Sequence, residues 1–326
     1  MTGAAPPVAA VVLGEAEVRL AAAGVATPRA DAEWLLAGLL GCGRSALQLR
    51  LQEPLPAGVA AGYERAVARR CRREPLQQIL GWEEFRGLRL RVTADVLVPR
   101  PETEVLVEAA LGLLPAGRPR VVDVGTGSGC IACSLARERP DCRVVAVDRC
   151  PRALAVARAN VDALGLAERV HLLCADLLGP VVSRGVDLVV ANPPYLPSSL
   201  LPSLPPEVRS WEPRLALDGG PDGLAVLRRL VSEAGRVLKP GGGLAVETAG
   251  GDQARVVAGL LENRGFVQVV VVRDLTGTGR IVTGRLRAPV PAPDAHPDAE
   301  GLPAQARSAS SWAGDPGRGA WPLAGA

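Results

Sequence analysis

Four consecutive residues, Asn192, Pro193, Pro194 and Tyr195, follow an apolar run at residues 186–191 that is typical of a buried strand. The Asn192 side-chain oxygen and the Pro193 carbonyl are two hydrogen-bond acceptors, and the fixed φ of the prolines holds that carbonyl in one direction. Such a pair suits a planar NH2 group, against whose flat face the Tyr195 ring could lie. The tetrapeptide therefore predicts a catalytic and substrate-binding site for an amide or an aromatic amine. The alternative is an ordinary Pro-rich turn, because Pro-Pro is common in loops that follow a strand.

A second motif is a glycine-rich loop between a predicted strand at residues 120–124 and a predicted helix. It consists of Gly125, Thr126, Gly127, Ser128 and Gly129. Glycines let the backbone approach a ligand closely, and an acidic residue at the end of the next strand accepts hydrogen bonds from ribose hydroxyls. Asp148 occupies that place. The pattern predicts a site for a cofactor that carries a ribose.

NAD and S-adenosylmethionine both present a ribose at such a loop, but the rest of each molecule differs. A pyrophosphate favours a helix N-terminus, whereas a methionine moiety favours polar backbone and a carboxylate near its ammonium. Asp123, inside the strand before the loop, is such a carboxylate, so the sequence favours S-adenosylmethionine. We expect Asp176, after the third strand, near the adenine edge and Leu177 against the adenine face. A second interpretation, compatible with the first, makes Asp176 a helix N-cap.

The elements that must position these motifs alternate between strand and helix from residue 118 to 287. Such alternation predicts an α/β fold, with a mostly parallel sheet covered by helices on both faces. Two final strands, at residues 267–272 and 280–286, are expected to form an antiparallel edge pair. We assign residues 118–287 to the catalytic domain, and we expect residues 288–326, rich in Pro, Ala, Gly and Ser, to be a disordered tail.

The N-terminal part shows helical signals only. Thr27 and Pro28 suit a helix start, and Gly41 suits a helix end. A later helix carries the basic run at residues 69–73, which we expect to be a solvated face, with contact to an acidic partner as the alternative. Residues 1–75 are therefore predicted to be a small helical domain that docks the substrate. Residues 76–117 are predicted to hold a β-hairpin linker, from the alternation at residues 85–98, and a connecting helix.

Composition limits the class of protein. The chain has 326 residues, a formal net charge of +3, 48% apolar residues and 3% aromatic residues. This balanced charge gives no support for binding a nucleic-acid backbone, so we expect no direct nucleic-acid partner. The N-terminus has neither a signal-peptide pattern nor a membrane span, and we expect the chain in the cytoplasm, away from membranes.

The cysteines and histidines offer little for catalysis or metal binding. Seven Cys, an odd number, do not fit a secreted disulfide framework and indicate a reducing compartment. Cys130 and Cys133 form a lone C-x-x-C within an apolar helical run, so we interpret them as small core side chains and expect no metal. The histidines are His171, in a predicted strand, and His296, in the tail. The sequence therefore predicts chemistry that needs no strong base.

Taken together, the motifs resemble the HemK/PrmC-type glutamine N5-methyltransferases, which modify peptide chain release factors. The segment Pro-Arg-Pro-Glu-Thr-Glu is more specific to this family than the glycine loop or the tetrapeptide, which other methyltransferases share. The chain departs from many relatives at Gln78, where they carry Tyr or His, and in its tail. The resemblance covers most of the chain, at residues 20–25, 78–81, 84–85, 98–104, 125–129, 192–195, 216–220, 273–274 and 284–285.

The resemblance implies a class I S-adenosylmethionine methyltransferase fold, Rossmann-like with an antiparallel edge hairpin, preceded by a small all-α domain. It implies that residues 125–129, Asp148, Leu177 and Asn192 contact S-adenosyl-L-methionine and that residues 192–195 bind a glutamine. The implied reaction methylates the N5 amide nitrogen of the glutamine in the GGQ motif of release factors. The release factor is then the protein partner, and we expect the enzyme to act as a monomer.

Several alternatives stay open. One is an N6-adenine or other nucleic-acid amine methyltransferase, which could use the same tetrapeptide on a flipped base. Another is a ribosomal-protein glutamine methyltransferase, and a third is a catalytically inactive scaffold that binds the cofactor. Arg100, Glu102 and Glu104 either contact the substrate or serve to cap and pair at a helix start.

Overall fold

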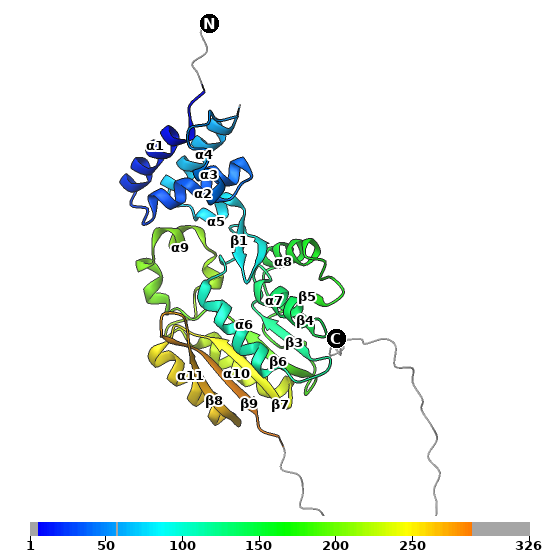
Figure 1. The fold of residues 1–326 in the computed structure, drawn as a ribbon. Helices are drawn as coiled ribbons and strands as arrows, with labels where there is room; N and C mark the ends of the chain where they lie inside the picture. Colours follow the sequence, from blue (N-terminus) through cyan, green and yellow to red (C-terminus); the bar gives the residue numbers. More distant parts are fainter. Residues whose placement is uncertain (1–5, 57, 289–326) are drawn as a thin grey trace, which may run out of the picture.

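The computed structural model describes residues 6–56 and 58–288. A helical unit is followed by a two-stranded hairpin and then by a larger α/β unit (Figure 1). Within the described part of the chain, no helix is both long and apolar enough to cross a membrane. The predicted tail lies outside the described residues, except for its first residue.

The helical unit begins with α1 (Ala9–Ala22) and α2 (Pro28–Leu40). Pro28 occupies the first turn of α2, and Gly41 ends it with a φ of 64°, in the left-handed region that favours glycine. Both helix limits agree with the sequence prediction. The Thr27 hydroxyl, however, donates to the Asp31 carboxylate at 2.8 Å and does not cap the backbone.

Three more helices complete this unit, α3 (Arg44–Gln48), α4 (Val59–Cys71) and α5 (Leu76–Leu80). The side chains of α5 pack against the same buried cluster as the other helices, so the helical packing continues past the predicted boundary at residue 75. The centre of this cluster is formed by Leu13, Leu20, Leu35, Leu36 and Tyr63.

The hairpin consists of β1 (Trp82–Phe85) and β2 (Leu88–Arg91), paired antiparallel. Leu88 and Leu90 are buried, and Arg89 and Arg91, which alternate with them, are exposed, as the alternation predicts. The predicted span at residues 85–98 is wrong in its limits, because the strands occupy residues 82–91 and the chain is irregular beyond them. The valines of residues 92–98 pack with residues of α8 in a separate small cluster, so their spacing reflects that packing and not a strand ladder.

The larger unit contains a seven-stranded sheet with the order β5-β4-β3-β6-β7-β9-β8. Strands β3 to β7 are parallel, and β9 pairs antiparallel with both β7 and β8, which confirms the predicted parallel sheet and antiparallel edge pair. The strands are β3 (Arg120–Val124), β4 (Arg143–Asp148), β5 (Val170–Cys174), β6 (Val186–Ala191), β7 (Leu238–Glu247), β8 (Phe266–Arg273) and β9 (Gly279–Leu286).

One face of the sheet is covered by α6 (Pro101–Leu113), α7 (Cys130–Glu138) and α8 (Pro151–Ala163). Cys130 and Cys133 lie buried in this face, as the sequence predicts. Burial raises the pKa of both thiols to about 12, which disfavours the thiolate form that binds zinc.

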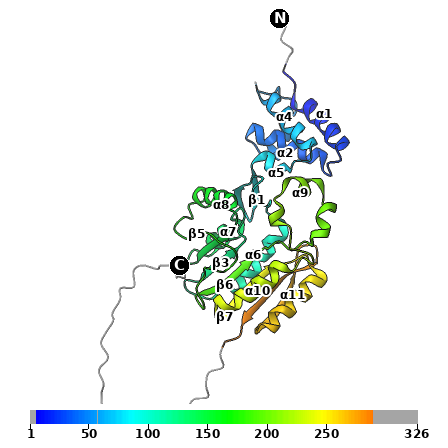
Figure 2. The same cartoon turned by 180° about the vertical axis from the view of Figure 1, so that it is seen from behind.

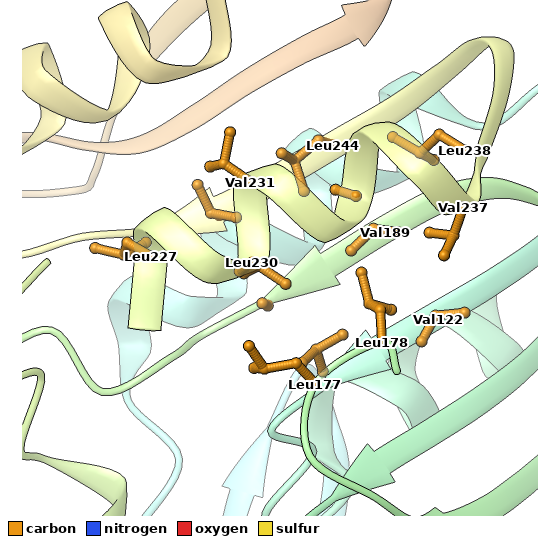
Figure 3. Close-up of a cluster of buried hydrophobic side chains, with 14 of the residues drawn as sticks. Val122, Leu177, Leu178, Val189, Leu227, Leu230, Val231, Val237, Leu238 and Leu244 are labelled. Atoms are coloured by element: carbon orange, nitrogen blue, oxygen red, sulfur yellow. The ribbon is translucent and has the colours of Figure 1, made fainter. Parts of the chain in front are cut away.

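The other face is covered by α10 (Ala225–Val237) and α11 (Gly251–Asn263). Figure 3 shows the apolar side chains of α10 directed at the sheet, where Val189 and Leu244 lie. Because the strands of a parallel sheet are buried on both faces, their sequences are continuous apolar runs. This explains why the sequence predicts these strands so clearly.

Between β6 and α10 the chain forms a segment that the sequence did not predict, with η1 (Ser198–Ser203), α9 (Pro206–Trp211) and η2 (Arg214–Ala216). Both overall views place α9 beside the helical unit (Figures 1 and 2). Glu207 on α9 accepts hydrogen bonds from Arg73 at 2.6 and 2.8 Å and from Arg70 at 2.9 Å.

These contacts correct the interpretation of the basic run as a solvated face. Arg70 is only 6% exposed and also pairs with Asp31 at 2.7 Å. The alternative interpretation, contact with an acidic partner, holds for Arg70 and Arg73. Their partner, Glu207, belongs to the same chain. The sequence could not show this because 137 residues separate Arg70 from Glu207.

Candidate active site

A cavity of about 260 Å³ lies at the carboxyl ends of β3, β4 and β6. In the sheet order, β4 lies on one side of β3 and β6 on the other, so this is the point where open α/β sheets form a ligand crevice. The cavity brings together most of the predicted site residues, which are Gly125, Thr126, Gly127, Ser128, Asp148, Asp176, Leu177, Asn192, Pro193 and Pro194. Gly129, at the start of α7, does not line it.

The glycine loop adopts a conformation that requires its glycines. Gly125, Gly127 and Gly129 have φ values of 73°, 54° and 82°, which side chains rarely allow. Gly127 N donates to Asp148 Oδ2 at 3.0 Å, and the other oxygen of Asp148 accepts from Cys150 N at 2.9 Å. A carboxylate has about four acceptor sites, so Asp148 keeps capacity for ribose hydroxyls while it holds the loop.

Asp123 lies beneath this loop and not in the cavity wall, and its closeness to the cofactor ammonium stays a prediction. It is fully buried, and its Oδ2 accepts hydrogen bonds from Thr126 Oγ1 at 2.6 Å and from Ala132 N at 3.2 Å. Burial raises its pKa to about 7. Its Oδ1 and the Ser128 hydroxyl are buried without a hydrogen-bond partner in the described part of the chain. Asp123 therefore shapes the loop from below.

Asp176 and Leu177 form part of the cavity wall at the end of β5. Residues 177–180, directly after Asp176, form a turn and not a helix, so the interpretation of Asp176 as a helix N-cap is wrong. Asp176 is half exposed and pairs with Arg229 of α10 at 2.7 Å. Leu177 has a φ of 52° and packs into the cluster beneath α10 (Figure 3), presenting an apolar surface to the cavity.

The polar side chains of the tetrapeptide converge on one buried carboxylate, Glu247 at the end of β7. Asn192 Nδ2 donates to Thr103 Oγ1 at 3.0 Å, and Thr103 Oγ1 donates to Glu247 Oε2 at 2.8 Å. The Tyr195 hydroxyl donates to Glu247 Oε1 at 3.1 Å. Burial raises the pKa of Glu247, and burial also raises that of Tyr195, so the phenol stays protonated. The Asn192 oxygen is left as the acceptor.

A glycine-containing loop supports the tetrapeptide from the backbone side. Leu196 N donates to Leu217 O at 3.0 Å, and Gly219 N donates to Leu196 O at 2.8 Å. A Cβ on Gly219 would lie 2.9 Å from the Pro194 carbonyl oxygen, closer than real Cβ contacts allow. The approach of these two segments explains why glycines follow Asp218 in the sequence.

Arg100 both lines the cavity and pairs with a buried acid. Its Nη2 donates to the two oxygens of Glu212 at 2.8 and 2.7 Å, and Pro101 occupies the first turn of α6. Glu104 accepts a hydrogen bond from Arg86 N at 2.9 Å. The pairing interpretation therefore holds for Arg100, whereas the start of α6 has no side-chain cap among the described residues and Glu104 binds the backbone of the hairpin. Arg100 also lines the cavity, and a substrate role for it stays a prediction.

Comparison with known proteins identifies the family. Residues 12–81 match the PrmC N-terminal domain, and residues 102–199 match the methyltransferase small domain. A release factor glutamine methyltransferase of Cereibacter sphaeroides is 47% identical over 86% of this chain and 99% of its own length. That of Moorella thermoacetica is 48% identical over 82% of this chain and 95% of its own. The chain belongs to the release factor glutamine methyltransferase family.

Membership confirms the predicted fold class, a class I S-adenosylmethionine methyltransferase with a helical N-terminal domain. Among solved structures, the hMettl16 catalytic domain in complex with a MAT2A 3'UTR hairpin has a TM-score of 0.52 and 17% identity, and covers 70% of this chain and 84% of that one. At that identity the likeness concerns the fold alone. S-adenosyl-L-methionine is the methyl donor of this enzyme, as predicted.

The residues present fit this cofactor. The glycine loop leaves its backbone open to the cavity, Asp148 retains acceptor capacity and Leu177 offers an apolar wall. Ser128 lines the cavity and its hydroxyl has no hydrogen-bond partner among the described residues, so a polar ligand group can satisfy it. Which of these residues contact the cofactor stays a prediction.

Two residues of the site, Thr103 and Glu247, were not predicted from the sequence. Glu247 did leave a signal, because it is a lone acid at the end of an apolar strand, the same pattern that pointed to Asp148. Tyr195, in contrast, was predicted as a site residue, but its ring packs against the core cluster and does not line the cavity. Stacking of that ring on the substrate stays a prediction.

Proposed function

We propose that this enzyme transfers a methyl group from S-adenosyl-L-methionine to the side-chain amide nitrogen, N5, of the glutamine in the GGQ motif of peptide chain release factors. The observation that carries the proposal is the orientation of Asn192. Its Nδ2 is engaged by Thr103, so its oxygen is the atom available to accept an N–H in the cavity wall. The names of the relatives supply the identity of the substrate protein.

An amide nitrogen is a poor nucleophile because its lone pair is delocalised into the carbonyl. When bound, the cofactor supplies an electrophilic methyl group on a sulfonium. The Asn192 oxygen and the Pro193 carbonyl are proposed to accept the two N–H groups of the glutamine. They orient the nitrogen and stabilise the positive charge that develops on it. Neither acceptor has to remove a proton before transfer, because the nitrogen loses its proton afterwards, in keeping with a cavity wall that contains no histidine among the described residues.

The helical unit is proposed to dock the release factor. Its side chains hold α9, and the residues just after α9, including Pro213 and Leu215, line the cavity. A protein bound to the helical unit would therefore lie close to the entrance of the site. Because translation factors work in the cytoplasm, we place the enzyme there, and we propose that it acts as a monomer.

The test incubates the purified chain with labelled S-adenosylmethionine and either a release factor or nucleic acid. Label on the GGQ glutamine supports the proposal, whereas label on a base supports an amine methyltransferase of nucleic acid. Label on neither, with cofactor still bound, contradicts both. Asn192→Ala should lower kcat by about 100-fold or more, as removal of one charge-stabilising group does. Asn263→Ala, on the exposed end of α11, is the matched control.

A further inference from the structure

Glu247 is a buried carboxylate whose setting the methyl transfer itself does not require. It is 1% exposed and forms no ion pair within residues 6–56 and 58–288. Its two oxygens instead accept hydrogen bonds from two hydroxyls, those of Thr103 and Tyr195. A carboxylate taken out of water without a cation is unfavourable, so its presence here points to a task that a neutral side chain does not perform.

The task follows from the direction of the hydrogen bonds. Both oxygens of Glu247 accept from hydroxyls, those of Thr103 and Tyr195, so the single hydroxyl proton of Thr103 points to Glu247. The Thr103 oxygen can then only accept from Asn192. That requirement selects the NH2 end of the Asn192 amide, at 3.0 Å, and turns the oxygen end away from Thr103.

We propose that Glu247 is a positioning residue that acts through Thr103 to fix which end of the Asn192 amide faces the substrate. The inference rests on the proposed function, in which the Asn192 oxygen accepts an N–H of the substrate glutamine. Neither Glu247 nor Thr103 exchanges a proton with the substrate. Their role is to keep an acceptor, and not a donor, directed at the amide nitrogen.

The structure also explains why an amide is a poor replacement at this position. A glutamine at position 247 presents NH2 as well as oxygen, and an NH2 directed at Thr103 makes the hydroxyl accept from it. The hydroxyl proton then points to Asn192, which favours the flipped amide with its oxygen on Thr103. A flipped Asn192 directs an N–H at the substrate N–H groups, and the two donors repel each other.

Kinetic measurements on single variants test whether Glu247 and Thr103 affect the rate of methyl transfer. Glu247→Gln should lower kcat by about 10- to 100-fold, with KM for the release factor changed by less than about 3-fold, because the acceptor matters most as charge develops on the nitrogen. Thr103→Val, which keeps the shape but removes the hydroxyl, should lower kcat similarly. Thr103→Ser should restore it to within about 3-fold of wild type.

A double-mutant cycle separates positioning from general damage to the fold. If Glu247 acts through Thr103, Glu247→Gln should have less than about a 2-fold further effect in a chain that already carries Thr103→Val. Effects that multiply, or a Glu247→Gln chain with wild-type kcat, would overturn the inference. Thermal unfolding of each variant shows whether it is folded, and Thr103→Val with its Ser rescue keeps the test valid if Glu247→Gln does not fold.

A spectroscopic measurement on the side-chain amide of Asn192 tests its orientation directly. The asparagines of this chain are Asn160, Asn192 and Asn263, so protein labelled with ¹⁵N in asparagine side chains gives a spectrum that single substitutions assign. Glu247→Gln should shift the Asn192 NH2 signals. Those of Asn160, a buried amide that donates to Ser128 O at 2.8 Å and Arg91 O at 3.0 Å, should stay in place. Unmoved Asn192 signals would overturn the inference.

The two proposals fail in different ways. A wild-type chain that labels no release factor contradicts the proposed function, and the Asn192 signals still test the positioning. A wild-type chain that labels the glutamine, with Glu247→Gln equally active, supports the proposed function and contradicts the positioning role.

Discussion

Glu207 joins the helical unit to α9, and its replacement by glutamine should loosen that junction. The carboxylate receives three hydrogen bonds from two arginines, of which Arg70 is buried and Arg73 is 23% exposed in its side chain. Breaking a buried ion pair from one side costs about 3–5 kcal/mol. Arg70 keeps its pair with Asp31 at 2.7 Å and Arg73 reaches solvent, so we expect a lower figure of about 2 kcal/mol for opening of the junction.

Hydrogen exchange of residues 198–216 measures this junction locally. A loss of about 2 kcal/mol should speed exchange of these amides about 30-fold, if they exchange by local opening. Glu64→Gln is the control, because Glu64 forms an ion pair with Arg19 at 2.7 Å in which both partners are exposed. Such pairs contribute about 0–1 kcal/mol, so that variant should change exchange by less than about 5-fold. Equal exchange in the Glu207→Gln and wild-type chains would refute the reasoning.

The same junction should respond to acid. Partial burial raises the pKa of Glu207, but the hydrogen bonds from Arg73 and Arg70 lower it further, so that the pKa of the folded protein lies below its ordinary value. A carboxyl of this kind stabilises the fold above its unfolded pKa, and the stabilisation is lost as the pH falls through the folded pKa. Loss of exchange protection at residues 198–216 below about pH 4, measured relative to the intrinsic exchange rate at each pH and absent from Glu207→Gln, is the expected sign.

Three further outcomes are expected. Gly223→Ala should cost about 2 kcal/mol in thermal unfolding, because φ is 74° there and a Cβ would strike the Tyr195 carbonyl. Burial raises the pKa of Asp123 from 3.8 to about 7, so stability without cofactor should fall by up to about 4 kcal/mol as the pH rises from about 4 to 7, and Asp123→Asn should flatten that slope in urea unfolding. Prolonged EDTA treatment should leave methyl transfer unchanged, since Cys130 and Cys133 are buried thiols.

Much of the α/β unit could be predicted because its signals are local. Apolar runs mark the strands buried on both faces, and the glycine loop and Asp148 follow adjacent parallel strands, whose carboxyl ends meet at one edge of the sheet. The tetrapeptide follows β6 at the same edge. Strand periodicity and parallel pairing predict the strands, and the strand order in the structure brings the glycine loop and the tetrapeptide together.

The parts that could not be predicted depend on contacts between distant segments. Thr103 lies 89 residues from Asn192 and 144 from Glu247, and no periodicity connects them. The irregular chain at residues 92–98 imitates a strand because its valines pack on α8. The basic run on α4 has the pattern of a solvated face, and only the return of α9 to the helical unit buries part of it.

The family motif at residues 99–104 gains a physical meaning from these contacts. Arg100 holds Glu212 at the end of α9, and Thr103, one turn into α6, holds Asn192. One short segment at the start of a helix therefore fixes both the position of the α9 segment and the polarity of the substrate acceptor. The segment can thus act on the site through the way in which Thr103 holds Asn192 of the tetrapeptide.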